Sequence, residues 1–542
     1  MYDNKIYHPL KYEPREIQKS ALEFTKYHIN RGKKFILINA PTGIGKSFFS
    51  VMFMNWYLNY INDDARFDIL TNSKILQNQY VNEFPFIKSL KGKNSYHCDT
   101  YNCSCAEGKE FNKALKKKCS NCPYDKALLD WKETNTAMTN FHLFNTIHLF
   151  LDRVVEEKKN NVLIIDEADT FESVLCDYIS MKISYRSLKL YGFNEVTISQ
   201  IYREISKVKN IFQYIDFVEN YFLKILENLS DSLTNKLGNP SIIQSEKVKI
   251  VKNLTNLKGG IESYNSFIND IKETEGNINN WTIDISVEDT KIFPKSYTIQ
   301  PVWSHNYLNK IIWNHYDHVI FMSGTILDKD MFAYMNGLDT KLCSYYSVDS
   351  PFDIKNRPIY YIKVGKMTFN EKEKTWEKQK NVIDKIIKKN KNNKGIIHTS
   401  NYELSKWLQE YYKDNDRFIF HDSDTRDQAL HKHILSDKPT ILVSPSMMSG
   451  VDLKDDLSRF QIIMKIPYPN ISSNKIKKRQ KDNKDWYSWK TVADIIQCYG
   501  RSIRSEDDFA ETYIIDESFS NILRYNYKFL PNWFTDAIKI LK

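Results

Sequence analysis

The segment APTGIGKS, residues 40 to 47, places two glycines, a lysine and a serine between an apolar run typical of a strand and one typical of a helix. The glycines let the backbone curl so that successive N–H groups point inward, and the N-terminus of the following helix adds positive potential. Such a loop binds the phosphates of ATP: Lys46 reaches the β- and γ-phosphates, and the Ser47 hydroxyl is a ligand for Mg²⁺. The residues expected to form it are Ala40, Pro41, Thr42, Gly43, Ile44, Gly45, Lys46 and Ser47. The strict pattern has glycine at the first of these positions, so the strand–loop–helix context carries part of the interpretation.

Two adjacent carboxylates, Asp166 and Glu167, follow the apolar run VLII. Acidic side chains that leave a buried strand are costly unless they hold a cation or transfer a proton. Asp166 suits the Mg²⁺ shell, and Glu167 suits the base that orients and activates the attacking water. Alone the pair also fits an acidic turn in solvent, but together with the phosphate loop it indicates nucleotide hydrolysis.

The segment IIQCYGRSIRSEDD carries two arginines, Arg501 and Arg504, with Gln497 one helical turn before the first. Residues three or four apart share one face of a helix. Guanidinium groups stabilise charge that builds on a γ-phosphate, and from a second domain they would make hydrolysis depend on domain closure. On its own the segment equally fits a basic helix face in solvent.

Five of the eight cysteines lie close together in the sequence. They are Cys98, Cys103, Cys105, Cys119 and Cys122. In a reducing cytosol such a cluster indicates metal binding or catalysis rather than disulfides. By local chemistry the C-x₂-C spacing suits tetrahedral Zn²⁺ as well as an iron–sulfur cluster, so both alternatives stay open.

The length of 542 residues indicates several domains, and 42% hydrophobic with 27% charged residues argues against wholesale disorder. The net charge of +10 permits a polyanionic partner without identifying one. Neither a leader peptide nor an apolar run long enough for a membrane span is evident, so we expect a cytoplasmic protein that does not bind membranes.

Strand-like and helix-like segments alternate in two regions of the chain, which predicts parallel α/β domains. The first region includes the phosphate loop and the segment NVLIIDEAD, and the second runs from about HVIFMSGTIL to ETYIIDES. Between them, from about residue 175 to residue 280, long Lys-, Asn-, Ile- and Leu-rich segments with few glycines predict a helical insertion.

Segments spread over nearly the whole chain, from about residue 12 to residue 516, resemble the XPD/DinG group of superfamily 2 helicases. In chain order they are YEPREIQ, APTGIGKS, LKGKNSYHC, CPYDKA, TNFHLF, DEAD, FMSGTIL, SPFD, PSMMSGVDL, KIPYPN and QCYGRSIRSEDD. The combination is specific, although single members such as SGT are not. The resemblance, with the short chain, implies a minimal bacterial or phage-type member without an additional nuclease domain.

The family fold implied by the resemblance is α/β, with two RecA-like P-loop motor domains. A cysteine-rich metal-cluster domain and a helical arch are inserted in the first of them. The expected ranges are 1–93, 133–175 and 291–335 for motor domain 1, 94–132 for the iron–sulfur domain, 176–290 for the arch, and 336–542 for motor domain 2.

The resemblance also assigns roles to positions in this sequence. Arg15 and Gln18 match the element that reads adenine. The other matched positions are Lys46 and Ser47 in the phosphate loop, Asp166 and Glu167 in the hydrolysis pair, Ser323, Gly324 and Thr325 in the coupling motif, Gly450 and Asp452 in the motif linking nucleotide to DNA, and Gln497, Arg501 and Arg504 in the arginine-finger helix. Asp169 stands where the family commonly has histidine, so the contacts that couple this motif to the second domain are expected to differ here.

The family's cysteine domain carries a [4Fe–4S] cluster on four thiolates. Cys98 and Cys122 match its first and last ligands, and Cys119 lies at a spacing that suits the same centre. The fourth ligand is then Cys103 or Cys105, and the sequence does not say which. Zn²⁺ remains the alternative metal.

The leading hypothesis is an ATP- and Mg²⁺-dependent, monomeric translocase and helicase that moves 5′ to 3′ on single-stranded DNA and acts at DNA junctions or forks. Its strand binding should be salt-sensitive and weakly sequence-specific. A second hypothesis is a nucleic-acid translocase that displaces bound protein without unwinding. The third is a non-catalytic nucleic-acid-binding or scaffold protein, against which the intact hydrolysis residues argue. The sequence identifies no protein partner.

Overall fold

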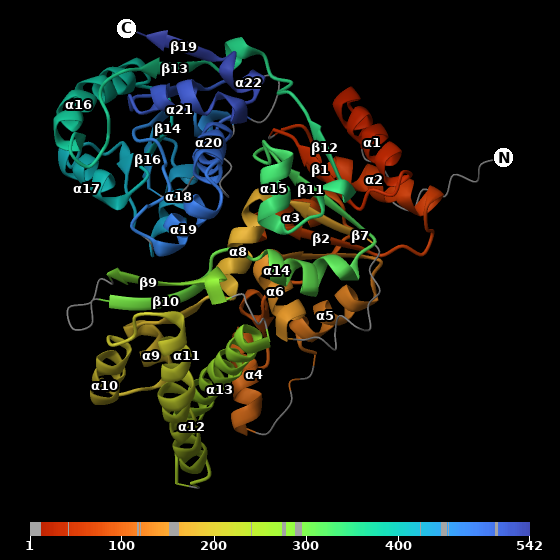
Figure 1. The fold of residues 1–542 in the computed structure, drawn as a ribbon, viewed down its shortest axis with the longest axis vertical. Helices are drawn as coiled ribbons and strands as arrows, with labels where there is room; N and C mark the ends of the chain where they lie inside the picture. Colours follow the sequence, from red (N-terminus) through yellow and green to blue (C-terminus); the bar gives the residue numbers. More distant parts are fainter. Residues whose placement is uncertain are drawn as a thin grey trace.

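The computed structural model describes residues 12–41, 43–115, 119, 121–150, 162–239, 241–273, 278–287, 295–422, 424–445, 453, 455–503 and 508–541. Two large parallel sheets, a group of helices and a small cysteine-containing subdomain make up this part of the chain (Figure 1). No helix among the described residues is long and apolar enough to cross a membrane.

The first sheet has seven strands in the order β12-β1-β11-β7-β2-β6-β3, and all neighbouring pairs are parallel. Its strands are β1 (Phe35–Asn39), β2 (Phe67–Thr71), β3 (Lys88–Ser89), β6 (Thr136–Asn140), β7 (Val162–Asp166), β11 (His318–Ser323) and β12 (Cys343–Ser347). Both faces are covered, because Ile36 and Ile38 belong to one buried cluster and Phe35 and Leu37 to another. Burial on both sides explains why these strands read as continuous apolar runs.

Helices cover the two faces of this sheet (Figure 1), and because all its strands are parallel, their carboxyl ends lie at the same edge. They include α1 (Glu16–Ile29), α2 (Lys46–Tyr60), α3 (Lys74–Glu83), α6 (Phe141–Phe150), α8 (Phe171–Tyr178) and α15 (Lys329–Asn336). The boundary that the sequence suggested at residue 335 falls before β12, which pairs with β1 in this sheet. Motor domain 1 therefore continues past that boundary.

The second sheet also has seven parallel strands, in the order β15-β16-β14-β17-β18-β13-β19. Its strands are β13 (Ile359–Ile362), β14 (Gly395–His398), β15 (Phe418–Ile419), β16 (Ile441–Ser444), β17 (Phe460–Ile463), β18 (Glu511–Ile514) and β19 (Ile538–Leu541). The helices around it are α16 (Lys372–Lys389), α17 (Tyr402–Tyr411), α18 (Arg426–Leu435), α19 (Asn474–Asp482), α20 (Trp486–Tyr499), α21 (Phe519–Tyr525) and α22 (Asn532–Thr535). Two parallel α/β sheets, as the sequence predicted, are thus confirmed.

Helices fill the region predicted as an arch, which confirms the helical insertion. They are α9 (Tyr185–Tyr191), α10 (Glu195–Ile205), α11 (Ile211–Phe217), α12 (Leu223–Leu237) and α13 (Gln244–Glu273). At their base lies an antiparallel sheet that the sequence analysis did not predict, formed by β8 (Met181–Ile183), β9 (Trp281–Val287) and β10 (Lys295–Pro301). Strand β10, expected in motor domain 1, therefore belongs with the base of the arch.

The cysteine-containing subdomain lies between β3 and β6 in the chain. It consists of a short antiparallel pair, β4 (His97–Cys98) and β5 (Cys103–Ser104), followed by α4 (Cys105–Leu115) and α5 (Pro123–Glu133). Helix α4 lies against α13 of the arch (Figure 1).

Helix α19 joins the second motor domain to the first domain and to the base of the arch. Arg479 on this helix forms an ion pair with Glu172 of α8, with 2.7 Å between Nη2 and Oε1, and both side chains are buried. The same guanidinium lies 4.5 Å from the ring centroid of Trp303. At the start of α19, the Asn474 N–H donates to Asp284 of β9 at 2.6 Å. The second motor domain therefore contacts both other parts through one helix.

Candidate active site between the two motor domains

The phosphate loop connects β1 to α2, as the sequence predicted. Gly43 and Gly45 adopt left-handed backbone angles, with φ of 83° and 79°. A Cβ atom at Gly45 would lie 2.4 Å from the Gln18 side-chain amide, so this position excludes larger residues for steric as well as conformational reasons. Thr42 lies outside the described residues.

Arg15 and Gln18, at the start of α1, contact this loop from outside. The Gln18 side-chain amide donates to the carbonyls of Ile44, at 2.9 Å, and Gly45, at 3.2 Å. An Nη1 of Arg15 donates to the Gly43 carbonyl at 3.1 Å. Both residues that the family resemblance linked to the nucleotide therefore lie at the phosphate loop, and they hold its shape.

The acidic pair lies opposite the loop. Lys46 Nζ is 3.7 Å from Glu167 Oε1, and both side chains are mostly buried. Asp166 ends β7 and is buried, and burial raises its pKa to about 6 although the charge of Lys46 acts in the other direction. Its two oxygens accept the Glu167 N–H and the Tyr80 hydroxyl, each at 3.0 Å.

Asp169 connects the first domain to the second. Its Oδ1 accepts the Ser323 hydroxyl at 2.6 Å, and its Oδ2 accepts the Gln497 amide from α20 at 3.2 Å. The Gln497 amide also donates to the Thr325 hydroxyl at 2.8 Å. Burial, together with the charge of Glu167, raises the pKa of Asp169. The residue that departs from the family pattern thus links the predicted coupling motif to the helix predicted to lead to the arginine finger.

Arg501 lies just beyond the same helix, which ends at Tyr499, and is buried. Its Nε donates to the Gln497 carbonyl at 2.9 Å, and its guanidinium also bonds the Gln497 side-chain oxygen. Its partner in the predicted pair, Arg504, lies outside the described residues, as do Gly450 and Asp452.

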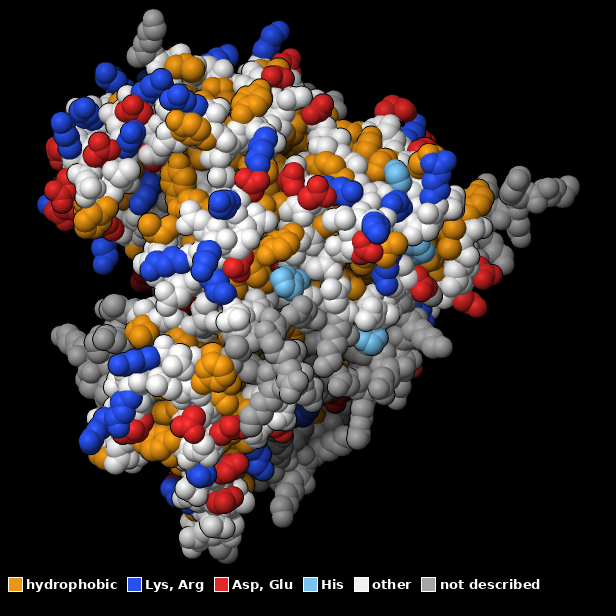
Figure 2. All heavy atoms as spheres, in the orientation of Figure 1, with side chains coloured by type: hydrophobic (Ala, Val, Ile, Leu, Met, Phe, Trp, Pro, Cys, Tyr) orange, Lys and Arg blue, Asp and Glu red, His pale blue; other side chains and the backbone are white. Residues whose placement is uncertain are grey.

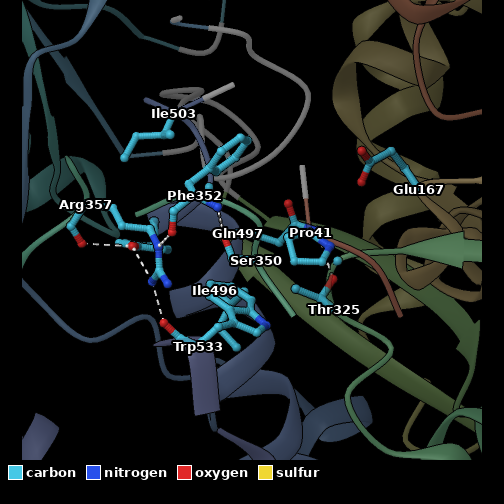
Figure 3. A pocket seen from close by; sticks show the side chains of 13 residues that line it. Pro41, Glu167, Thr325, Ser350, Phe352, Arg357, Ile496, Gln497, Ile503 and Trp533 are labelled. Atoms are coloured by element: carbon cyan, nitrogen blue, oxygen red, sulfur yellow. Dashed lines mark hydrogen bonds between the residues drawn. The ribbon is translucent and has the colours of Figure 1, made fainter. Parts of the chain in front are cut away.

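A cavity opens between the two domains beside these residues (Figure 3). Pro41, Glu167 and Thr325 reach it from the first domain, and Gln497 reaches it from the second. Its other lining residues are Gly324, Ser350, Phe352, Arg357, Ile496, Tyr499, Gly500, Ile503 and Trp533.

Sequence reasoning missed Arg357, a buried arginine that lines this cavity. Its Nε donates to the Phe352 carbonyl at 2.9 Å, and its guanidinium also bonds the Trp533 carbonyl. No motif in the sequence marks it. These bonds hold together the wall that the second domain contributes.

The phosphate loop, Asp166 and Glu167 lie together at one end of the first sheet. The curled backbone and the N-terminus of α2 provide phosphate donors, and the buried Asp166 together with Ser47 provides hard oxygen ligands for Mg²⁺. The residues present therefore fit a nucleotide with its cation.

The five cysteines of the small subdomain all carry free thiols. The sulfur of Cys98 is 3.8 Å from that of Cys119, and the sulfur of Cys122 is 4.0 Å from that of Cys105. Strand pairing places Cys103 opposite Cys98. Among the described residues, no three His, Cys, Asp or Glu side chains are placed to hold one metal ion. Five thiols are enough for a metal centre with four thiolate ligands, and thiolate is a suitable ligand type. In this structure four of the thiols lie in two close pairs, Cys98 with Cys119 and Cys105 with Cys122.

Two family models match this chain. One is described as a helicase C-terminal domain and matches residues 383–537, and the other, described as the res subunit of type III restriction enzymes, matches residues 11–198. A curated relative, the ATP-dependent DNA helicase CHL1 of Vanderwaltozyma polyspora, is 28% identical over 129 residues. That match spans 19% of this chain and 16% of the relative's length.

Solved structures of similar fold cover almost the entire chain. A structure titled XPD helicase has a TM-score of 0.66 at 16% identity and covers 98% of this chain and 100% of its own. One titled XPD apo has a TM-score of 0.62 at 15% identity, covering 97% and 100%. The structure of S. tokodaii Xpd4 has a TM-score of 0.57 at 14% identity, with the same coverage. The overall fold of this chain is therefore similar to the fold of these solved structures.

Proposed function

We propose that this chain is an XPD-like superfamily 2 helicase that hydrolyses ATP to move along single-stranded DNA and to unwind duplex DNA. The observation that carries the proposal is the continuous set of contacts across the two domains. Lys46 lies beside Glu167, and Asp169, two residues further, contacts Gln497 of the second domain. These contacts support a nucleotide site that is formed by residues of both motor domains.

Bound ATP and Mg²⁺ would supply the γ-phosphoryl group and its charge-neutralising cation. Lys46 and the loop N–H groups would hold the phosphates, while Ser47 and Asp166 would provide oxygen ligands for the cation. Glu167 accepts a hydrogen bond from the attacking water and takes up its proton. Its contact with Lys46 directs the carboxylate toward the phosphate loop.

Asp169 provides the link from hydrolysis to domain movement. Its two oxygens bond a residue of the first domain and one of the second, so a shift at the acidic strand end changes the position of α20. Arg501 is held by Gln497 on that helix. We infer that Gln497 and Arg501 move as a unit with the second domain when ATP binds and is hydrolysed.

Single-stranded DNA, with junctions or forks, is the proposed substrate, and the proposed direction is 5′ to 3′. Figure 2 shows Lys and Arg side chains of the described residues distributed over the visible face, with Asp and Glu between them. A motor that binds the DNA backbone along an extended track would have salt-sensitive affinity and weak sequence preference.

The cysteine subdomain is the proposed site of a [4Fe–4S] cluster, with Zn²⁺ as the alternative. Cys98 and Cys122 are the proposed first and last ligands in chain order. Cys119 and either Cys103 or Cys105 are the other two. When bound, the cluster would cross-link the short strands to α4 and α5. The thiol pairs Cys98–Cys119 and Cys105–Cys122 support this, because each joins parts of the subdomain that are distant in sequence.

Directional strand displacement tests the proposal. Purified protein is mixed with ATP, Mg²⁺ and a short duplex that has either a 5′ or a 3′ single-stranded tail, and we expect unwinding of the 5′-tailed duplex. Lys46→Ala should abolish unwinding, whereas Lys413→Ala, at an exposed lysine of the second domain, should leave it unchanged. ATP hydrolysis without unwinding, combined with removal of streptavidin from a biotinylated strand, would instead support a protein-displacing translocase.

A further inference from the structure

Tyr80 is a buried tyrosine whose hydroxyl reaches the acidic end of β7. It is 2% exposed, lies on α3, and donates to Asp166 Oδ2 at 3.0 Å. The Ser50 hydroxyl of α2 is its other hydrogen-bonding neighbour, and Ser50 in turn donates to the Lys46 carbonyl at 3.2 Å. Tyr80 therefore lies between the cation-binding carboxylate and the helix that follows the phosphate loop.

The carboxylate of Asp166 needs donors because it is buried at a strand end. Each of its oxygens has one: the Glu167 N–H on Oδ1 and the Tyr80 hydroxyl on Oδ2, both at 3.0 Å. Two donors on opposite oxygens fix the rotation of the carboxylate plane. Without Tyr80, one oxygen would lose its fixed partner and the plane could turn about the Cβ–Cγ bond.

Helix α3 holds Tyr80 in place. The Gln77 amide, one turn earlier, donates to the Leu90 carbonyl at 3.1 Å and its oxygen accepts the Asn140 amide at 3.2 Å. The ring of Tyr80 packs in the core on one face of the first sheet. Its hydroxyl is therefore positioned by the body of the domain and is present before any ligand arrives.

We propose that Tyr80 is a positioning residue for the Mg²⁺ site, whose hydroxyl fixes the orientation in which Asp166 receives the cation. The inference rests on the proposed function, because it assumes that Asp166 serves Mg²⁺ bound with a nucleotide. Tyr80 belongs to none of the motifs in the sequence. Groups that hydrogen-bond a metal-binding carboxylate orient it and tune its affinity.

Tyr80→Phe removes the hydroxyl and leaves the ring in the core. Tyr316→Phe is a matched control, since the Tyr316 hydroxyl donates to Asp68 Oδ2 at 2.7 Å in the same domain and is likewise buried. The measurement is binding of a fluorescent ADP analogue as Mg²⁺ is titrated, with nucleotide binding in EDTA recorded separately. Thermal melting verifies that each variant is folded.

We expect Tyr80→Phe to raise the half-saturating Mg²⁺ concentration about tenfold while nucleotide binding in EDTA stays unchanged. Tyr316→Phe should match the wild type. In an Asp166→Asn background, the additional effect of Tyr80→Phe should disappear, because the hydroxyl acts through that carboxylate.

An unchanged Mg²⁺ titration in Tyr80→Phe would overturn the inference while leaving the proposed function intact. An equal effect in the Asp166→Asn background would also overturn it, since Tyr80 would then act by another route. If the wild type binds nucleotide without any response to Mg²⁺, the proposed function fails together with the inference.

Discussion

Replacing Arg479 by methionine tests the buried ion pair that joins the second motor domain to the rest of the molecule. The side chains of Arg479 and Glu172 are 5% and 1% exposed, and the pair is 2.7 Å apart. Methionine keeps much of the packing volume but leaves the buried Glu172 carboxylate without its ion-pair partner. Breaking a buried pair in this way costs about 3–5 kcal/mol of unfolding free energy. A loss of this size lowers the unfolding midpoint on the order of 10 °C for a domain of this kind.

The pH dependence of the effect follows from the pKa of Glu172. Burial acts to raise that pKa, but the charges of Arg479 and Lys475 outweigh it, and the pKa lies below its ordinary value. A carboxylate with a depressed folded-state pKa stabilises the fold above its unfolded-state pKa, and the contribution is lost as the pH falls through the folded-state pKa. The difference between wild type and Arg479→Met should therefore be largest near neutral pH and shrink below about pH 4.

Thermal unfolding followed by circular dichroism measures the shift, and Lys528→Met provides the control. Lys528 pairs with Asp485 at 2.5 Å, but the two side chains are 57% and 56% exposed. Exposed pairs contribute about 1 kcal/mol or less. Equal midpoint shifts for the two variants would refute the reasoning, since burial of the Arg479 pair would then carry no additional cost.

Variants of the nucleotide site and of the cysteine segment separate the roles proposed for their residues. Glu167→Gln should keep nucleotide binding but lower the hydrolysis rate by roughly 10²–10⁴, measured as phosphate release, because the base is lost. Asp169→Ala should reduce DNA-stimulated hydrolysis roughly tenfold by removing the contacts to Ser323 and Gln497, with intrinsic nucleotide affinity retained in a binding titration. Cys98→Ser should lose bound iron or zinc in metal analysis, while Cys343→Ser, at an isolated core cysteine, should keep it.

Local patterns were sufficient to predict much of the motor. The glycines of the phosphate loop, the apolar run before Asp166 and the alternation of strand and helix are all short-range features. The resemblance to a known family then placed Gln497 and Ser323 at the same site. Whether the cysteine segment holds a metal remains a prediction.

Contacts between distant parts of the chain could not be predicted in this way. Asp169 meets Ser323 and Gln497 across separations of 154 and 328 residues, and Tyr80 meets Asp166 across 86. The sequence around a hydroxyl or amide group does not indicate which distant residue it will hydrogen-bond. The sheet at the base of the arch was missed for a different reason: WTIDISV alternates apolar and polar residues throughout, as a half-buried strand does, but it was grouped with the neighbouring helical segments.

ATP hydrolysis coupled to DNA binding is the central property proposed for this protein. The measurement is the steady-state rate of phosphate release with and without single-stranded DNA, for the wild type, Lys46→Ala and Gln497→Ala. We predict that DNA stimulates hydrolysis by the wild type, that Lys46→Ala is inactive, and that Gln497→Ala retains nucleotide binding but loses the stimulation. Equal hydrolysis by the wild type and Lys46→Ala, or no hydrolysis by the wild type under any DNA and Mg²⁺ condition, would contradict the account.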